Sequence, residues 1–99
     1  MTIEYFVYIL RCSDNTYYVG VTNNLQRRLY EHENSFNENS YTSKRLPVIL
    51  VYQCAFRDIE EAIRFEKKIK KWPRAKKEAL INSNFKVLPE LSKKKNFKK

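Results

Sequence analysis

A single glutamate on an apolar helix face is the residue whose position most needs an explanation. Glu66 falls in the middle of the apolar stripe of the helix predicted over residues 57–71. That stripe consists of Ile59, Ala62, Ile63 and Ile69. A lone carboxylate on a buried face is costly unless it pairs with a cation or binds a metal ion. Glu66 is therefore either half of a structural ion pair with a nearby arginine or part of a functional site, and its position alone favours neither.

Two further polar residues share the inward face of another predicted helix. Arg28 and His32 are four positions apart, so they lie one turn above each other beside the apolar stripe of Leu25 and Leu29. An arginine and a histidine facing inward here could converge with Glu66 over a sheet. Taken singly, His32 is better explained as a histidine at a helix end whose hydrogen bonds are satisfied. Arg28 is then explained as the ion-pair partner of Glu66.

Two tyrosines fall near the middle of predicted paired strands. A short turn at residues 13–15 would place Tyr8 alongside the row formed by Tyr18 and Gly20. A buried phenol hydroxyl needs a partner, and packing alone would explain either tyrosine. Gly20, the only glycine in the chain, would permit the close approach of another group, which we expect to be a phosphate.

The pattern of apolar and turn residues predicts the elements that position these side chains. Strands are expected over residues 5–12, 16–21 and 48–56, and the first of them is apolar on both faces, as in a central strand. Helices are expected from a cap at Asn23 or Asn24 through Phe36, from a cap at Asp58 to about Lys71, and from Pro73 to Ala79–Ile81. A helical turn near residues 89–91 is a weaker expectation.

This ββαβαα order predicts an α+β fold, a small three-stranded antiparallel sheet flanked by helices. The 99 residues suffice for one domain, which we expect over residues 1–84, followed by a basic tail over residues 85–99. The polar segment 35–46 is a long loop for so small a domain, and long loops are more often functional than filler.

Composition excludes several classes of protein. No apolar run approaches the length of a membrane span, and no secretory signal is visible at the N-terminus, so we expect a cytoplasmic protein. One glycine is too few for a phosphate-binding glycine loop. One histidine, with Cys12 and Cys54 42 positions apart, does not make a zinc site, and both cysteines are expected to be reduced core residues.

The net charge of +9 is unevenly distributed along the chain. Residues 1–63 carry six basic and eight acidic side chains, whereas residues 64–99 carry fourteen basic and three acidic ones. Such a surface attracts polyanions, most commonly nucleic acid, although a solvated lysine face or an anionic membrane surface would also explain it.

These residues together resemble a known family. Phe6-Val7-Tyr8, Tyr18-Val19-Gly20, Arg28 with His32, and Glu66 follow the order and spacing of the GIY-YIG nucleases. The segments YTSKRLPVILVY and EAIRFEKKIKKW look like the small standalone bacterial members, and the resemblance covers about residues 3–82. Each short motif alone is weak evidence for the family, but five motifs in the family's order and spacing are a specific signal.

The resemblance implies roles for individual residues. Tyr8 and Tyr18 match the tyrosines of the two motifs, and Arg28 and His32 match the arginine and the histidine of the first helix. Glu66 matches the carboxylate that holds a divalent metal, Mg²⁺ or Mn²⁺. Two departures are Phe6, where the motif opens with glycine, and the family's late asparagine, for which Asn82 and Asn84 are the only candidates.

The implied activity is metal-dependent hydrolysis of phosphodiester bonds in DNA by an endonuclease, with DNA repair or recombination as its setting. Arg28 would hold the phosphate, and Tyr8, with Tyr18 or His32, would orient or deprotonate the attacking water. The expected contacts to the flanking backbone are made by Lys44, Arg45, Lys67, Lys70 and Lys71, besides Gly20.

Two alternatives remain open from the sequence. One is a basic module that binds DNA or RNA without catalysis, which leaves Glu66 unexplained. The other is an adaptor whose site has decayed. A monomer is the default expectation for the oligomeric state.

Overall fold

The computed structural model describes residues 3–34 and 41–86, with the side chains of residues 83–86 excepted. The elements follow the predicted ββαβαα order. They are β1 (Tyr5–Arg11), β2 (Tyr17–Thr22), α1 (Leu25–Glu33), β3 (Ile49–Phe56), α2 (Ile59–Lys70) and α3 (Arg74–Lys86). The α+β fold with a three-stranded antiparallel sheet is therefore confirmed.

The first strand is the centre of the sheet. The strand order is β2-β1-β3, and residues 7–10 of β1 are fully buried, which explains why this strand is apolar on both faces. Among the described strands β2 pairs only with β1, so the other edge of β2 is an open edge of this sheet. In the β1–β2 pair Tyr8 lies opposite Gly20, and Leu10 lies opposite Tyr18, as the short turn predicted.

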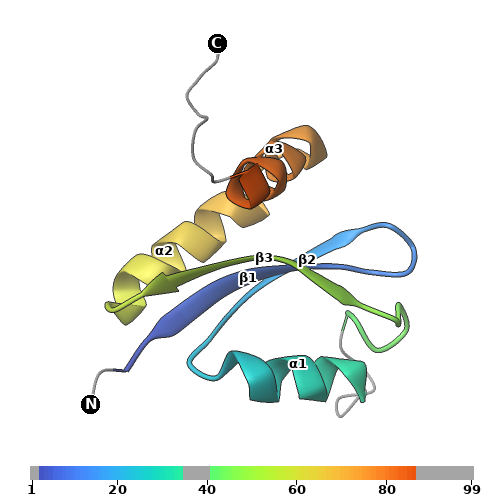
Figure 1. Cartoon of the computed structure of the whole chain (residues 1–99), viewed down its shortest axis with the longest axis horizontal. Coiled ribbons are helices and arrows are strands. Elements are labelled where there is room, and N and C mark those ends of the chain that lie inside the picture. Colours follow the sequence, from blue (N-terminus) through green and yellow to red (C-terminus); the bar gives the residue numbers. More distant parts are fainter. Residues whose placement is uncertain (1–2, 35–40, 87–99) are drawn as a thin grey trace.

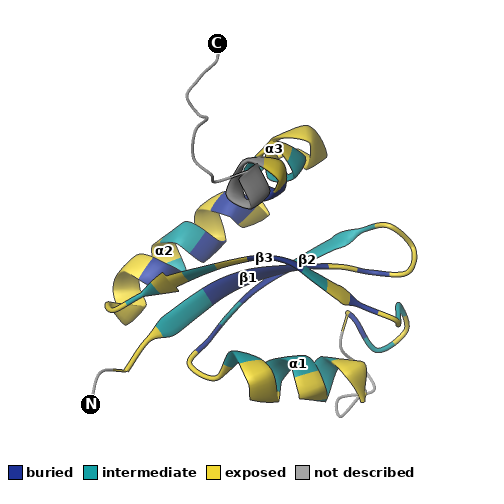
Figure 2. Cartoon of the chain, in the orientation of Figure 1, coloured by how far each residue is buried: buried dark blue, intermediate teal, exposed yellow. Residues whose placement is uncertain are grey.

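Helices cover both faces of this sheet (Figure 1). Alternate residues of β1 point to opposite faces, so the chain has two apolar clusters. On one face Val7 and Ile9 pack with α2 and α3, whose buried residues include Ala62 and Ile69 (Figure 2). On the other face Tyr8 and Leu10 lie in a second cluster, against which the half-buried leucines of α1 pack.

Both predicted caps are present at the starts of the helices. The Asn24 side chain accepts a hydrogen bond of 3.1 Å from the backbone N–H of Arg27, and the Asp58 side chain accepts one of 3.0 Å from Glu60. Each cap satisfies a backbone donor that the first helical turn leaves without a partner. These caps fix where α1 and α2 begin, and therefore where Arg28 and Glu66 lie.

The ends of two helices differ from the prediction. α1 ends at Glu33, where Asn34 is its C-cap, whereas the apolar pattern extended to Phe36, which lies outside the described residues. α3 continues to Lys86, beyond the predicted end at Ile81. The periodic pattern fades there, but an established helix gains one hydrogen bond for each added residue, and no proline or glycine intervenes. The expected helical turn at 89–91 and most of the tail over residues 85–99 lie outside the described residues.

Within residues 3–34 and 41–86, no helix combines the length and apolar character that crossing a bilayer requires. Both cysteines are free, Cys12 buried and Cys54 half-buried, as expected for reduced core residues.

The single glycine has a packing role that the sequence analysis did not foresee. A Cβ atom placed on Gly20 would lie 2.5 Å from Tyr8 Oη and 2.6 Å from Tyr8 Cζ. The backbone here has negative φ, so the position requires glycine for space and not for conformation. The close approach expected for a phosphate is made in this structure by the Tyr8 phenol, which lies directly across from Gly20.

We expect Gly20→Ala to destabilise the fold by about 1–3 kcal/mol, because the new methyl group forces the Tyr8 ring out of its place. Urea unfolding measures this cost. In a Tyr8→Ala background the same substitution should be neutral or slightly stabilising, since alanine restricts the unfolded chain more than glycine does. An equal cost in both backgrounds would show that Tyr8 is not the reason for the glycine.

Candidate active site

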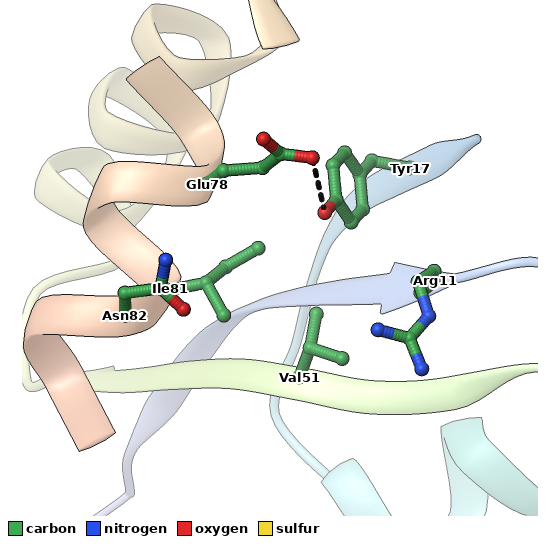
Figure 3. Close-up of a pocket in the computed structure, with 6 residues that line it drawn as sticks. All are labelled: Arg11, Tyr17, Val51, Glu78, Ile81 and Asn82. Atoms are coloured by element: carbon green, nitrogen blue, oxygen red, sulfur yellow. Dashed lines mark hydrogen bonds between the residues drawn. The ribbon is translucent and has the colours of Figure 1, made fainter. Parts of the chain in front are cut away.

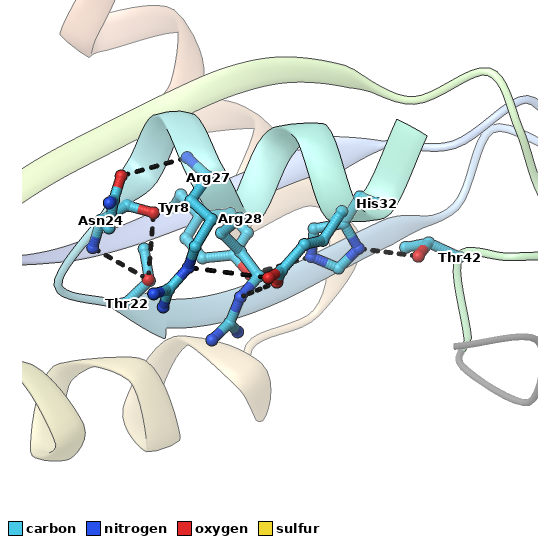
Figure 4. A network of polar contacts seen from close by, with 8 residues as sticks. Tyr8, Thr22, Asn24, Arg27, Arg28, His32 and Thr42 are labelled. Atoms are coloured by element: carbon cyan, nitrogen blue, oxygen red, sulfur yellow. Dashed lines mark hydrogen bonds and ion pairs between the residues drawn. The ribbon is translucent and has the colours of Figure 1, made fainter. Parts of the chain in front are cut away.

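Three side chains from distant parts of the chain meet between the sheet and α1 (Figure 4). Tyr8 Oη lies 3.0 Å from His32 Nε2, and His32 Nδ1 lies 2.8 Å from Thr42 Oγ1. Tyr8 and Thr42 are fully buried, while His32 is half-buried. Every polar atom of the His32 ring therefore has a partner inside the protein, and the imidazole has a fixed orientation.

The second tyrosine completes this group. The Tyr18 ring centroid lies 5.1 Å from that of His32 and 6.3 Å from that of Tyr8, and its ring is inclined to both. We call Tyr8, Tyr18 and His32 the phenol cluster. The structure thus brings together three of the side chains that the sequence analysis singled out, and it does so where β1, β2 and α1 meet.

Arg28 lies beside this cluster, on the same side of α1 as His32 (Figure 4). Its Nε lies 3.3 Å from Glu31 Oε1, within ion-pair distance. The geometry nevertheless makes no hydrogen bond, so Nε is a buried donor without a hydrogen-bond acceptor among the described residues. The expected pairing of Arg28 with Glu66 is therefore wrong, because the nearest carboxylate is Glu31, one turn along the same helix. A donor left in this state suits an incoming anion.

Burial keeps the Tyr8 phenol protonated. Loss of solvent, with a smaller contribution from Tyr18, raises the pKa of Tyr8 to about 12, although the Arg28 guanidinium beside it acts in the opposite direction. At neutral pH Tyr8 is therefore a hydroxyl donor. It can position a water molecule or a phosphate oxygen, but it is not itself a ready base.

The environment of His32 favours its neutral form. Burial, and next the charge of Arg28, lower the pKa of His32 from its ordinary value of 6.5. The guanidinium of Arg28 can only donate to the Tyr8 oxygen, so the phenol proton is directed toward Nε2. We therefore expect the tautomer in which Nε2 accepts from Tyr8 and Nδ1–H donates to Thr42. Of the groups here, neutral His32 is the one able to take up a proton near pH 7.

Glu66 is buried on α2, on the other face of the sheet, with about a tenth of its side chain exposed. Lys70 Nζ, one helical turn further on, lies 2.7 Å from Glu66 Oε2. The hydrogen bond to Glu66 raises the pKa of Lys70, so the partner is an ammonium ion at neutral pH. The cation beside the carboxylate is thus a lysine of the same helix and not the arginine that the sequence suggested.

The open edge of β2 connects the two halves of the site. Tyr18, whose ring contacts His32 on the α1 side, also lines a groove with Lys70 of α2. No described strand lies beyond β2, and Tyr18 of β2 and Lys70 of α2 both line this groove. Tyr18 is therefore the link between the phenol cluster and the Glu66–Lys70 pair.

The donors fit a hard divalent cation that keeps much of its water. Across the described segments, no three side chains of His, Cys, Asp or Glu gather as a metal-binding group. Glu66 would therefore be the single carboxylate ligand that the protein supplies. Mg²⁺ and Mn²⁺ can be bound by a single protein carboxylate when water molecules and substrate oxygens fill the other coordination positions. Zinc, in contrast, needs three or four protein ligands. The Lys70 ammonium would have to move aside for such an ion.

The predicted backbone contacts divide into two groups. Lys44, Lys67, Lys70 and Lys71 are exposed, as a contact to a polyanion requires. Arg45 is half-buried and held within the protein, since Nε lies 2.9 Å from Asp14 Oδ2 and its guanidinium also donates to the Tyr41 carbonyl. These contacts hold the loop in place and leave fewer of the Arg45 N–H donors for a ligand.

Sequence reasoning missed Thr42 and Tyr41. Thr42 is the partner of His32, and the Tyr41 ring stacks on Tyr18 with centroids 6.0 Å apart. Both lie in the segment 35–46 that its length marked as functional. No periodicity reaches into such a loop, so the pattern could identify the segment but not these two side chains.

Comparison with known proteins identifies the family of this chain. A family model described as the GIY-YIG catalytic domain matches residues 4–79, which include the whole phenol cluster and Glu66. The chain belongs to the GIY-YIG family. The family is one of nucleases, and the resemblance seen in the sequence is confirmed.

Relatives within the GIY-YIG family carry the name UPF0213. UPF0213 protein VNG_2274C of Halobacterium salinarum is 47% identical over 75 residues, which are 76% of this chain and 96% of that protein. UPF0213 protein DP2720 of Desulfotalea psychrophila is 42% identical over 80 residues, 81% of this chain and 73% of that protein. The solution NMR structure of EF2693 from E. faecalis matches with a TM-score of 0.63 and 34% identity, covering 88% of this chain and 92% of that one.

The GIY-YIG site predicts a specific state for the only histidine of the chain. We expect NMR of the His32 ring nitrogens to show a proton on Nδ1 and none on Nε2, with a pKa below 6.5. Thr42→Val removes the acceptor and should redistribute the two tautomers, whereas Thr42→Ser should preserve the wild-type spectrum. A proton on Nε2 in the wild type, or no change in Thr42→Val, would contradict the assignment.

The same titration has a consequence for stability. A lowered pKa means that the unfolded chain binds a proton more readily than the folded one near pH 6. The stability contributed by neutral His32 is therefore present above pH 6.5 and falls as the pH drops through the folded pKa, which unfolding measurements between pH 7 and 5 can follow.

Proposed function

We propose that this GIY-YIG protein is a divalent-metal-dependent endonuclease that hydrolyses phosphodiester bonds in DNA. One observation carries the proposal. A protonated phenol and a neutral imidazole lie together with an under-bonded arginine beside them, and Tyr18 of this cluster lines a groove with Lys70, the ion-pair partner of the buried Glu66. Phosphodiester hydrolysis needs donors for the phosphate oxygens, a group that takes up a proton and a cation ligand, and these residues supply all three.

Arg28 binds the phosphate in this proposal. Its Nε has no hydrogen-bond acceptor among the described residues, so a phosphate oxygen would supply an acceptor that this donor lacks. Glu31 lies 3.3 Å away and competes for the same guanidinium, which makes the contact exchangeable with a phosphate oxygen. A planar guanidinium can hold two oxygens of one phosphate at once.

Tyr8 and His32 orient and deprotonate the attacking water in this proposal. The Tyr8 hydroxyl, with a pKa raised to about 12, orients the water and relays its proton, which finally resides on His32. When the water loses its proton to the phenol oxygen, the phenol proton passes to His32 Nε2, 3.0 Å away. The resulting imidazolium remains held by Thr42 through Nδ1. Tyr18 closes the cluster on the side of the open edge.

Glu66 would hold the metal ion. A divalent ion bound there supplies positive charge that polarises the phosphate and stabilises the leaving oxygen. Lys70, which neutralises Glu66 in the absence of the ion, would be released toward the groove that it shares with Tyr18. Gly20, Lys44, Arg45, Lys67 and Lys71 remain proposed contacts to the nucleic acid.

The proposal extends to the setting of the protein. We propose a single catalytic domain over residues 1–84 with a basic arm over 85–99, acting as a monomer in the cytoplasm on DNA intermediates of repair or recombination. A non-catalytic nucleic-acid-binding module remains the second candidate, favoured by the charge of +11 on residues 64–99.

Substitution of the buried carboxylate distinguishes these two functions. In Mg²⁺, we expect the wild type to nick supercoiled plasmid or branched DNA and Glu66→Gln to lose at least 100-fold in rate, because the ion loses its protein ligand. DNA binding measured without metal should be equal or tighter, since a negative charge is removed. Glu61→Gln, an exposed glutamate on the same helix, is the matched control and should keep its activity.

Equal cleavage by Glu66→Gln and Glu61→Gln would show that Glu66 does not bind the ion. If the wild type binds DNA but cleaves no member of a panel of nicked, flapped, branched and single-stranded substrates with Mg²⁺ or Mn²⁺, the protein is a binding module.

A further inference from the structure

The Glu31 carboxylate lies against Arg28, the residue proposed to bind the phosphate, yet it takes no part in the proposed proton transfer or metal binding. Its Oε1 lies 3.3 Å from Arg28 Nε, and its Oε2 lies 3.6 Å from Arg27 Nε (Figure 4). The carboxylate therefore bridges two arginines of its own helix, three and four positions before it.

A glutamate with a structural role has different contacts, as Glu78 on α3 shows. Glu78 pairs with Arg74 at 3.0 Å, and it also accepts a hydrogen bond of 3.2 Å from Tyr17 Oη of β2 (Figure 3). That second contact ties α3 to the sheet. Within the described residues, Glu31 forms ion pairs only with the two arginines of α1, so these pairs join it to no other element. Because ion pairs within one exposed helix face contribute little to stability, the position of Glu31 needs another explanation.

A phosphate bound to Arg28 has to lie close to this carboxylate. Arg28 Nε makes no hydrogen bond among the described residues, so it is a donor that an incoming phosphate oxygen can use. Such an oxygen lies about 2.9 Å from the nitrogen, and Glu31 Oε1 already lies 3.3 Å from the same atom. Arg27, which pairs with the other carboxylate oxygen, keeps Glu31 nearby when Arg28 turns to the phosphate.

The charge of Glu31 also extends to the phenol cluster. Burial is the largest cause of the pKa shifts of Tyr8 and His32, and it raises the first pKa and lowers the second. The charge of Glu31 acts to raise both pKa values, as a nearby negative charge does. The same charge acts on any anion that binds beside these groups.

We propose that Glu31 determines which phosphate this site binds, favouring the single negative charge of a phosphodiester over the double charge of a phosphate monoester. At the same place, a dianion is repelled by the carboxylate twice as strongly as a monoanion. A monoester carries its second charge above a pKa of about 6. The inference rests on the proposed nuclease function and adds to it the chemical class of phosphate that is bound.

This preference suits the hydrolysis of bonds within a strand. Water adds to the phosphorus, one P–O bond breaks, and the departing oxygen takes up a proton. One product end is then a hydroxyl and the other a phosphate monoester, so the charge of the group beside Arg28 rises from one to two. Glu31 therefore weakens the binding of the phosphorylated product and favours internal bonds over phosphorylated ends.

The test compares two probes at pH 8 and constant ionic strength, dimethyl phosphate with one charge and methyl phosphate with two. The NMR signal of Arg28 Nε–H measures their binding. We expect Glu31→Gln to tighten the binding of dimethyl phosphate about 3-fold and that of methyl phosphate about 10-fold, because doubling the repulsion squares the factor. Glu33→Gln removes an exposed charge from the same helix and should leave the ratio of the two affinities unchanged.

Equal tightening for both probes in Glu31→Gln, or none, would overturn this role of Glu31. The ring signals of His32 verify that the variant is folded, since the partners of that ring are Tyr8 and Thr42. In an Arg28→Gln background, Glu31→Gln should no longer change the ratio. A change that persists there would show that the anion binds elsewhere.

A second measurement uses cleavage in Mg²⁺. We expect Glu31→Gln to lower the inhibition constant of a terminally phosphorylated oligonucleotide several-fold more than that of the same oligonucleotide with hydroxyl ends. Equal changes in a protein that still cleaves would overturn the inference and preserve the nuclease function. The predicted selectivity for the two small probes in a protein that cleaves nothing would instead preserve the role of Glu31 and overturn the nuclease function.

Discussion

The burial of the Glu66 carboxylate is the constraint on which the rest of the structure depends. A carboxylate with a tenth of its surface exposed on an apolar helix face must be compensated by a cation, and here Lys70 provides that charge at 2.7 Å. A surface lysine one turn away is a replaceable partner, since its own side chain is about half exposed. In our proposal this lysine gives way to a divalent cation.

On the other face of the sheet, the phenol cluster consists of side chains that are held in place by contacts within the protein. Tyr8 fills the space above Gly20, which fixes its hydroxyl against His32, and Thr42 fixes the second nitrogen of that ring. The groups that would bind a negatively charged substrate are thus arranged before it arrives, and burial favours the neutral forms of Tyr8 and His32. Preorganised donors of this kind stabilise developing charge without the cost of reorienting at the moment of reaction.

The sequence was sufficient for most of the fold because its signals are local. The apolar character of both faces of β1, the caps at Asn24 and Asp58 and the helix boundary between Lys71 and Pro73 all follow from short-range physics, and the element order was predicted correctly. Glu66 was also found locally, as a polar residue in an apolar period. Its partner was not, because the choice between Arg28 and Lys70 depends on which face of the sheet each helix covers. Thr42, Tyr41 and the role of Gly20 depend on contacts across the fold that no periodicity encodes.

The central claim is that Glu66 binds a divalent ion within reach of the phenol cluster. Paramagnetic broadening by Mn²⁺ tests it without any nucleic acid, since the effect of the ion falls steeply with distance from each NMR signal. We predict that substoichiometric Mn²⁺ broadens the signals of Glu66, Lys70 and Tyr18 first, that excess Mg²⁺ reverses the broadening, and that Glu66→Gln abolishes it. Broadening that is absent from these residues, or unchanged in Glu66→Gln, would contradict the account.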